Sequence, residues 1–513
     1  MNGAQHALEA ACAAGVEVCF ANPGTTEMDL VTALDSSPAI RSVLCLFEGV
    51  ATGAADGYGR ILGKPALTLV HLGPGFANGI ANLHNARRAG TPIVNLIGDH
   101  PSWHLESDSP LTSDIDSLAS PVSKWVRRSN SADRFAQDMV EAIATAKGPP
   151  SGVASLIVAQ DAAWNEASAG MPTVSVPESS LDEDLIQRAA LDLKERGERG
   201  ALLLGSRALR PSLEAAARIQ AATGCQVFLD TFMARLEQGR GLPNFETLPY
   251  FPEQAIEKLS GLQAMVVAGS RRPIAFFGYK SIGRSELLPD DCECNVISGL
   301  GVDSSPALLA MADELDAPRW TPGQQGAPPI EPEGQLDTMN LGLALVSVLP
   351  ENAIVVNESA TSSLGWAVHS KTAAAHDVLN LTGGAIGQGL PNSIGAAIAA
   401  PDRPVVALQA DGSGMYTVQG LWTMAREQLN ISVIVCANRA YRILQAELKR
   451  AGNSEPGSAA MSMTELSSPE LNWAQIAQGM GVPSVRATRA EEVVGALRRS
   501  FQEPGPMLIE ALL

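Results

Sequence analysis

The sequence is poor in aromatic residues and in positive charge, and it contains no long apolar run. Aromatic side chains make up 4% of the 513 residues, and 36 lysines and arginines stand against 55 aspartates and glutamates, a formal net charge of −19. A nucleic-acid-binding protein would show a basic stripe, and none is visible. No apolar run approaches the ~18 residues of a membrane span, and residues 1–15 read as an amphipathic helix rather than a signal peptide. We therefore expect a soluble, cytoplasmic protein without a nucleic-acid or membrane partner.

Cysteine is also scarce, and its spacing argues against a zinc site. The seven cysteines are odd in number and include no CxxC pair. They are Cys12, Cys19, Cys45, Cys225, Cys292, Cys294 and Cys436. Most lie in apolar, strand-like runs, so we expect buried free thiols in a reducing compartment.

The apolar residues that are present suffice for a large core, and they are arranged in three parts. At ~100–200 residues per domain the length predicts about three domains. Two polar, proline-containing segments, residues 167–184 and 318–337, divide the chain into 1–166, 185–317 and 338–513. In each part, short runs rich in Val, Ile and Leu alternate with helical patterns, which predicts parallel sheets covered on both faces. The predicted fold class is therefore α/β, with three doubly wound domains.

Polar side chains follow two of the C-terminal apolar runs. Asp411 comes directly after residues 405–410, and Asn438 comes directly after residues 431–437, at a separation typical of one βαβ unit. Both should therefore project from the same edge of neighbouring parallel strands. A carboxylate and an amide oxygen beside a glycine turn suit Mg²⁺ bound to a diphosphate, because Mg²⁺ takes few protein ligands and completes its octahedron with phosphate oxygens and water. The alternative is an aspartate that caps a helix and an asparagine in a turn.

Ordered motifs run through the whole chain. They are FANPGTTE (20–27), LFEGVATGAADGYGR (46–60), HLGPGFANGIANLHNAR (71–87), NESATSS (357–363), TGGAIGQGLPNSIGAAIA (382–399), and the segment ADGSG to NRAY (410–441). Together they resemble the thiamine diphosphate-dependent enzymes of the acetolactate synthase and benzoylformate decarboxylase type. The resemblance implies a pyrimidine-binding, a central and a diphosphate-binding domain, in that order.

This resemblance implies the cofactors, the reaction and the assembly. The cofactors would be thiamine diphosphate and Mg²⁺, and the substrate a 2-oxo acid that is decarboxylated. The resulting enamine would be either protonated or condensed with a second carbonyl, as acetolactate synthase does. In the family, the pyrimidine domain of one subunit caps the diphosphate domain of another, which implies at least a homodimer and favours a homotetramer.

The resemblance also assigns roles to single residues. Glu48 would hydrogen-bond a pyrimidine-ring nitrogen of the cofactor and handle its proton, although a glutamate at a helix start can simply answer the macrodipole. His71 and Thr25 would lie near the reacting carbon, whereas a lone histidine is more often structural. Mg²⁺ would be held by Asp411, Asn438 and the backbone carbonyl of Ala440. The residues expected to contact the cofactor are Glu48, Ala360, Thr361, Gly384, Ile386 (otherwise a plain core aliphatic), Asp411, Gly412, Ser413, Asn438, Ala440 and Tyr441.

Some positions depart from the family pattern. Ala410 replaces the first glycine of GDG, and NRA replaces NNG, but both motifs keep their oxygen ligands. Gln445 and Glu447 stand where benzoylformate decarboxylases place aromatic residues, which argues against an aryl pocket and makes both candidate substrate residues. His100 lies where acetolactate synthases often carry a glutamine, so it is a third candidate; with His104 it would make only a weak zinc pair. Matches to flavin-contacting segments are missing, and we expect no flavin.

Three alternatives to an acetolactate synthase-like reaction remain open. One is a non-ligating 2-oxo acid decarboxylase of the benzoylformate decarboxylase type. Another is a non-catalytic paralogue that kept the fold. The third is a dinucleotide oxidoreductase, because residues 73–75 and 299–301 echo glycine-rich turns, although neither completes GxGxxG with a following acid.

Overall fold

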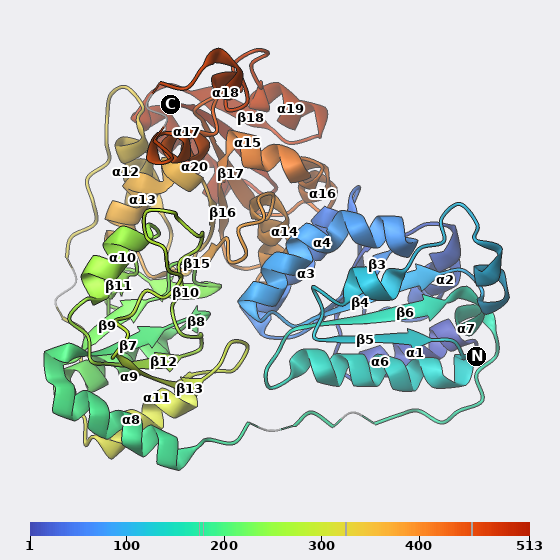
Figure 1. The fold of residues 1–513 in the computed structure, drawn as a ribbon. Helices are drawn as coiled ribbons and strands as arrows, with labels where there is room; N and C mark the ends of the chain where they lie inside the picture. Colours follow the sequence, from blue (N-terminus) through green and yellow to red (C-terminus); the bar gives the residue numbers. More distant parts are fainter. Residues whose placement is uncertain (174, 178, 324–325, 453–454) are drawn as a thin grey trace.

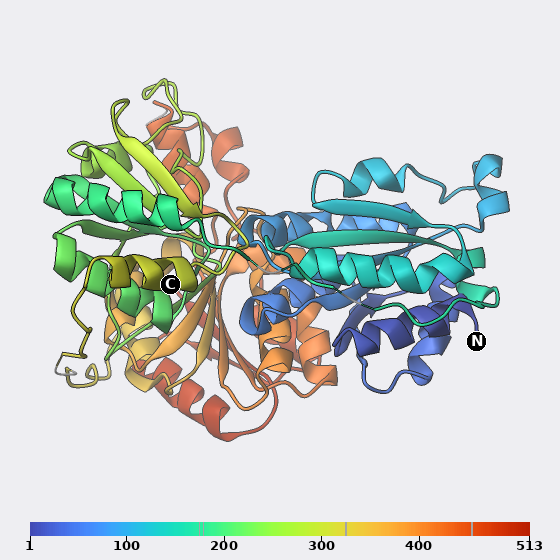
Figure 2. The ribbon, with the colours of Figure 1, turned by 90° about the horizontal axis from the view of Figure 1, so that it is seen from below.

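The computed structural model describes residues 1–173, 175–177, 179–323, 326–452 and 455–513. Three α/β units each surround one sheet, which confirms the predicted fold class (Figure 1). Seen from below, the N-terminal unit extends to one side while the central and C-terminal units lie together (Figure 2). In the stretches between α7 and α8 and between α11 and α12, the described residues form no helix and no strand beyond single bridges.

The N-terminal unit contains a six-stranded parallel sheet in the order β2-β1-β3-β4-β6-β5. Strands β3, β4 and β6 are buried along their whole length, as continuous apolar runs predict. Helices α1 and α6 cover one face, and α3 and α4 cover the other. The strands are β1 Val18–Asn22, β2 Arg41–Leu44, β3 Ala66–Val70, β4 Ile93–Asp99, β5 Trp125–Ser129 and β6 Val153–Ala159. The helices are α1 Gly3–Ala13, η1 Thr25–Glu27, α2 Met28–Asp35, α3 Glu48–Leu62, α4 Leu72–Ala89, η2 Ser102–Ser107, α5 Ile115–Ala119, α6 Ala132–Lys147 and α7 Gln160–Trp164.

The central unit contains a five-stranded parallel sheet in the order β11-β9-β7-β12-β13. Its strands are β7 Gly200–Leu204, β9 Gln226–Leu229, β11 Glu246–Thr247, β12 Ala264–Ala268 and β13 Glu293–Ser298. Its helices are α8 Glu183–Arg196, η3 Gly197–Arg199, α9 Arg210–Thr223, α10 Pro252–Leu259 and α11 Ser305–Glu314. Helices α8, α9 and α11 share a hydrophobic core on one face of this sheet, and α10 packs on the other.

The C-terminal sheet has eight strands in the order β18-β19-β17-β16-β14-β15-β10-β8. Two of them, β8 Arg207–Ala208 and β10 Arg235–Gln238, come from the central part of the chain, and β10 pairs antiparallel with β15. The expectation of purely parallel sheets is wrong at this one pairing. The other strands are β14 Ile354–Glu358, β15 His376–Asn380, β16 Val405–Ala410, β17 Ile431–Ala437, β18 Ser484–Ala487 and β19 Met507–Leu512. The helices are α12 Thr338–Val348, η4 Ala360–Ser363, α13 Leu364–His369, η5 Ser370–Thr372, α14 Gly389–Ala399, α15 Asp411–Gly414, η6 Met415–Thr417, α16 Gly420–Arg426, α17 Arg442–Arg450, α18 Ser458–Ser462, α19 Trp473–Gly479 and α20 Ala490–Gln502.

Helix α3 joins the N-terminal unit to the C-terminal unit by packing on α14 (Figure 1). The approach is close enough to require glycine, because a Cβ at Gly395 would lie 1.9 Å from the carbonyl oxygen of Ala54. Further along α3, the buried Arg60 guanidinium donates to both carboxylate oxygens of Asp56 (2.9 and 2.6 Å) and to the carbonyl of Asn380 (2.7 Å). This buried pair therefore ties the end of α3 to the end of β15.

Two composition-based expectations can be compared with the structure. All seven cysteines are free and five are buried, which confirms free thiols that are mostly buried. Among the described residues, no helix has the length and apolarity needed to cross a membrane.

Candidate active site

The structure brings Asp411 and Asn438 to the same edge of the C-terminal sheet. Strands β16 and β17 are parallel neighbours with Ala410 opposite Cys436, and each polar residue follows its strand. Oδ2 of Asp411 accepts the backbone N–H of Arg439 (2.7 Å), and Oδ1 accepts that of Gly412 (2.8 Å). Burial raises the pKa of the Asp411 carboxyl, and the hydrogen bonds from these N–H groups offset part of that rise. The predicted juxtaposition is confirmed by the strand register.

The donor set at this edge suits a divalent cation that shares its ligands with a phosphate. The Asn438 amide oxygen accepts the backbone N–H of Ala440 (3.0 Å), and its amide nitrogen donates to Ser362 (3.1 Å). No group of three or more His, Cys, Asp or Glu side chains able to hold a metal occurs in the part of the chain that the structure describes. A site with one carboxylate and one amide is incomplete for most metals, but it fits Mg²⁺ completed by phosphate oxygens.

Two segments beside this edge present backbone to the same region. Ala360 and Thr361 are exposed at the start of η4, and Ala360 adopts the left-handed conformation (φ +49°), which is uncommon for a residue with a Cβ. Gly384 is exposed with φ +77°, and Ile386 is half-buried two residues further on. Gly412 and Ser413 are buried in α15, and a Cβ at Gly412 would lie 2.5 Å from the Tyr441 ring.

Glu358 supports the second segment and was missed by the sequence reasoning. Its Oε1 accepts the backbone N–H groups of Gly387 (2.6 Å) and Gln388 (3.3 Å), and its Oε2 accepts that of Gly389 (2.6 Å). The Gln409 amide also donates to Oε2 (3.1 Å). Burial raises the pKa of this carboxyl, and the four donors lower it in part. Glu358 therefore holds the turn that follows Gly384 and Ile386.

Glu48 begins α3 at the carboxyl edge of the N-terminal sheet. The residue is 7% exposed, and Asn78 of α4 donates to its Oε2 (3.0 Å). A Cβ at Gly75 would lie 2.8 Å from Oε1, so glycine leaves the room that the carboxylate occupies. A surface helix charge would need neither a buried site nor an amide partner, and this geometry favours the functional interpretation of Glu48.

The second predicted group of the N-terminal unit surrounds His71. The residue follows β3, and its Nδ1 lies 2.8 Å from Oε2 of Glu27, a fully buried residue that the sequence reasoning did not single out. Thr25 is exposed at the start of η1, while the buried Thr26 lies 3.3 Å from the same nitrogen. His71 is thus held by the loop that contains Thr25.

The three candidate substrate residues all have partners within the protein. Nε2 of His100 lies 3.0 Å from the Ser109 hydroxyl. The Gln445 amide nitrogen donates to Thr464 (3.2 Å), and Glu447 accepts from the Tyr279 hydroxyl (3.1 Å). Each of the three side chains thus makes at least one contact within the protein and keeps further hydrogen-bonding capacity.

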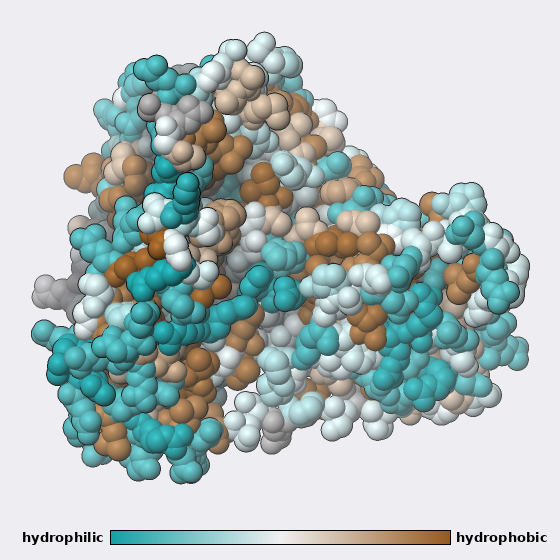
Figure 3. Space-filling view, in the orientation of Figure 1, coloured by the Kyte–Doolittle hydropathy of each residue, from teal (hydrophilic) through white to brown (hydrophobic). Residues whose placement is uncertain are grey.

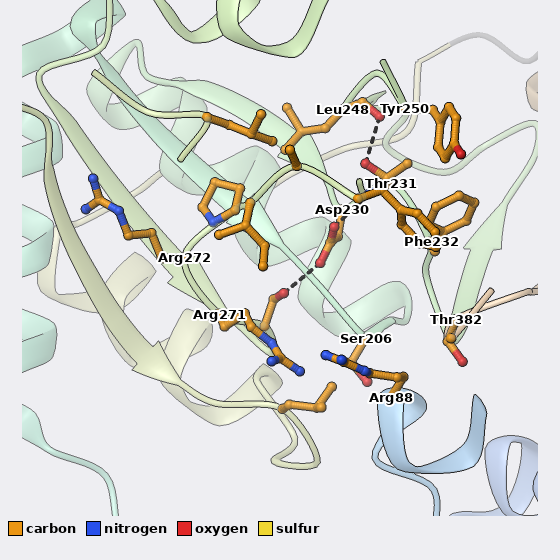
Figure 4. A pocket seen from close by; sticks show the side chains of 18 of the residues that line it. Arg88, Ser206, Asp230, Thr231, Phe232, Leu248, Tyr250, Arg271, Arg272 and Thr382 are labelled. Atoms are coloured by element: carbon orange, nitrogen blue, oxygen red, sulfur yellow. Dashed lines mark hydrogen bonds between the residues drawn. The ribbon is translucent and has the colours of Figure 1, made fainter. Parts of the chain in front are cut away.

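A cavity of about 390 Å³ opens beside Gly383, at the carboxyl ends of the central strands. Asp230 lies in its wall and accepts from the Ser270 hydroxyl (2.6 Å), and the side chains of Arg88 and Arg271 lie nearby (Figure 4). Burial raises the pKa of Asp230. Phe276 also lines the cavity, and its ring would lie 2.7 Å from a Cβ at Gly384. The cavity therefore adjoins the loop predicted to meet the cofactor.

Comparisons with known proteins agree with this geometry. Residues 1–120 match the N-terminal TPP binding domain of thiamine pyrophosphate enzymes, and residues 360–511 match the C-terminal TPP binding domain. The chain is 45% identical over 515 residues to IlvX of Mycobacterium tuberculosis, which is named a putative acetolactate synthase large subunit, with 100% of this chain and 99% of that protein aligned. It is 26% identical over 529 residues to benzoylformate decarboxylase of Pseudomonas aeruginosa, covering 97% of this chain and 96% of that one.

A comparison with solved structures gives a similar result for the fold. The solved structure of the thiamine diphosphate-dependent 4-hydroxybenzoylformate decarboxylase of Rhodococcus jostii superposes with a TM-score of 0.85 at 23% identity, over 99% of this chain and 98% of that chain. The full-length match to IlvX and the two matched cofactor-binding domains assign the family. The chain belongs to the thiamine pyrophosphate-dependent enzymes of the acetolactate synthase and benzoylformate decarboxylase type.

Proposed function

We propose that the protein uses thiamine diphosphate and Mg²⁺ to decarboxylate a 2-oxo acid and to join the product to a second carbonyl compound. The observation that carries this proposal is the pair of polar sites at the carboxyl edges of two sheets, the buried Glu48 and the Asp411–Asn438 edge. Mg²⁺ would be held by Asp411, Asn438 and the Ala440 carbonyl. The diphosphate would lie against Ala360, Thr361, Gly412 and Ser413, with Gly384, Ile386 and Tyr441 along the rest of the cofactor.

The chain's own residues would position the reactants and move protons. Thiamine diphosphate supplies a nucleophilic carbon and takes up the electrons released with carbon dioxide. Glu48 would hold a proton at a pyrimidine-ring nitrogen, and its burial beside Asn78 keeps that carboxyl away from water. His71 and Thr25 would exchange protons with the substrate.

We propose a homodimer as the smallest active unit, and a homotetramer as the assembly. Glu48 begins α3, and large apolar side chains are exposed just before it and in the C-terminal unit, Leu46 at 45% exposure and Tyr416 at 54%. The space-filling view shows apolar surface over α3 and α4 beside the C-terminal unit (Figure 3). A second copy that covers this surface would bring its own Asp411 edge to Glu48.

Carboligation is preferred because the 45% identical relative is named for that reaction and because Gln445 and Glu447 are ill suited to an aryl pocket. The second candidate is a decarboxylase without ligation. It is favoured by a histidine at position 71 and by the benzoylformate decarboxylases among the relatives.

Cofactor binding and substrate turnover test the proposal separately. Titration with thiamine diphosphate and Mg²⁺, followed by circular dichroism, should show saturable binding that Asp411→Ala abolishes and that the exposed-site control Asp402→Ala retains. A panel of pyruvate, branched 2-oxo acids and benzoylformate should release carbon dioxide, and this release should be lost in Glu48→Gln. Acetoin-type products would support carboligation, whereas aldehyde products would support a decarboxylase without ligation. Absence of cofactor binding by the wild type would refute both.

A further inference from the structure

We propose that Glu27 is a positioning residue that holds the His71 ring with its proton on Nδ1 and leaves Nε2 free to exchange protons with the substrate. This inference rests on the proposed function, because it assigns the state in which His71 would act. It concerns a contact between residues 44 positions apart, which no motif in the sequence indicates.

The Glu27 carboxylate is surrounded by donors. Its Oε2 accepts the backbone N–H of Gly24 (2.7 Å) and faces Nδ1 of His71 (2.8 Å). Its Oε1 accepts the Thr26 hydroxyl (2.6 Å). The side chain is fully buried, so water does not compete for these bonds. An ionised carboxylate accepts and does not donate, and the Nδ1 contact is therefore a hydrogen bond only when that nitrogen carries the proton.

The arrangement selects one tautomer of the neutral ring. In a histidine, the partner of one ring nitrogen decides which nitrogen is protonated. With Nδ1–H directed at Glu27, the lone pair of the neutral ring resides on Nε2, which has no hydrogen-bond partner among the described residues. The His71 side chain is 25% exposed, while that of Glu27 is 0% exposed. The ring is thus anchored through its buried nitrogen and accessible through the rest.

Two glycines leave space for this pair. A Cβ at Gly24 would lie 2.3 Å from Nδ1 of His71, and a Cβ at Gly98 on β4 would lie 1.7 Å from Oε1 of Glu27. Both distances are far below van der Waals contact, so any larger residue would displace the ring or the carboxylate. The backbone on both sides therefore leaves room for the Glu27–His71 hydrogen bond. A histidine that only fills space would not require this room.

The protonated nitrogen can be observed directly. In protein labelled with nitrogen-15 histidine, the His71 signals, assigned by their absence in His71→Ala, should show a protonated Nδ1 and an unprotonated Nε2 in the neutral ring. Glu27→Ala should remove this preference, and Glu27→Gln, which keeps one acceptor oxygen, should retain most of it. The same tautomer in wild type and in Glu27→Ala would overturn the proposal. Gly24→Ala should disturb the tautomer from the other side, and it replaces Glu27→Ala if that variant does not fold.

Steady-state kinetics provide a second test of the role of Glu27. Glu27→Ala should lower kcat by about 10- to 100-fold, no more than the loss of the histidine itself, since acid–base groups contribute about 10²–10⁴. KM for the 2-oxo acid should change little, thiamine diphosphate should still bind, and the exposed control Glu9→Ala should match the wild type. The double variant Glu27→Ala/His71→Ala should match His71→Ala within about twofold. Additive losses would show that Glu27 acts independently of His71. If the wild type turns over no 2-oxo acid, the proposed function fails, while the nitrogen-15 measurement still decides the role of Glu27.

Discussion

Replacing Glu358 with glutamine should destabilise the turn at residues 387–389 and weaken cofactor binding. The carboxylate accepts three consecutive backbone N–H groups and the Gln409 amide, two donors on each oxygen. Glutamine has nearly the same shape but only one acceptor oxygen. Its NH₂ group would therefore face two buried donors, whichever way the amide is turned.

The size of the effect follows from those contacts. A buried donor left without an acceptor costs about 1–3 kcal/mol, so two of them cost roughly 2–6 kcal/mol. Because burial raises the pKa of Glu358, the ionised carboxylate carries a desolvation cost that neutral glutamine avoids, and this offsets part of the loss. We expect a net loss of about 2–3 kcal/mol in the free energy of unfolding at pH 7.

Urea unfolding of both proteins measures this difference. Glu351→Gln removes a carboxylate from an exposed turn of the same unit and serves as the matched control, with a change within about 0.5 kcal/mol. Titration with thiamine diphosphate and Mg²⁺ should show weaker binding by Glu358→Gln than by the control. If Glu358→Gln unfolds at the wild-type urea concentration and binds the cofactor equally well, the four hydrogen bonds do not hold the turn as argued.

Three further predictions concern buried groups. Asp56→Ala should reduce the unfolding free energy by about 3–5 kcal/mol, because it leaves the Arg60 guanidinium buried without its carboxylate, and thermal unfolding measures the loss. Burial lowers the pKa of His376 from 6.5 to about 4, so between these pH values the unfolded chain binds more protons than the folded protein. The free energy of unfolding should therefore fall by up to roughly 3 kcal/mol as the pH drops from about 6.5 to about 4. In a pH series of urea unfolding, the free energy of His376→Gln should depend less steeply on pH than that of the wild type, and an equal dependence would contradict this. Gly98→Ala should destabilise the protein by about 1–3 kcal/mol through overlap with Glu27, and Glu27→Ala in the same chain should restore part of it.

Strand positions and the meeting of Asp411 with Asn438 were predictable because buried parallel strands are continuous apolar runs. Strands β16 and β17 begin and end at the residues where the apolar runs do, and Asp411 and Asn438 follow them. Given parallel neighbours, both had to meet at one edge. The antiparallel pairing of β10 with β15 was not predictable, since it joins segments about 140 residues apart and their patterns carry no sign of a shared partner.

The sequence by itself therefore determined the fold class, the order of the units and the family, because apolar periodicity and motif spacing are local properties of the chain. Only the tertiary structure decided which polar side chains meet. Glu27 contacts His71 because β1, β3 and β4 are neighbours, and Glu358 reaches residues 387–389 because β14 ends beneath that turn. The cavity beside Gly383 likewise collects residues from all three units. A hydrogen bond depends on the final position of two groups, and that position is set by the packing of sheets and helices rather than by the residues next to either group.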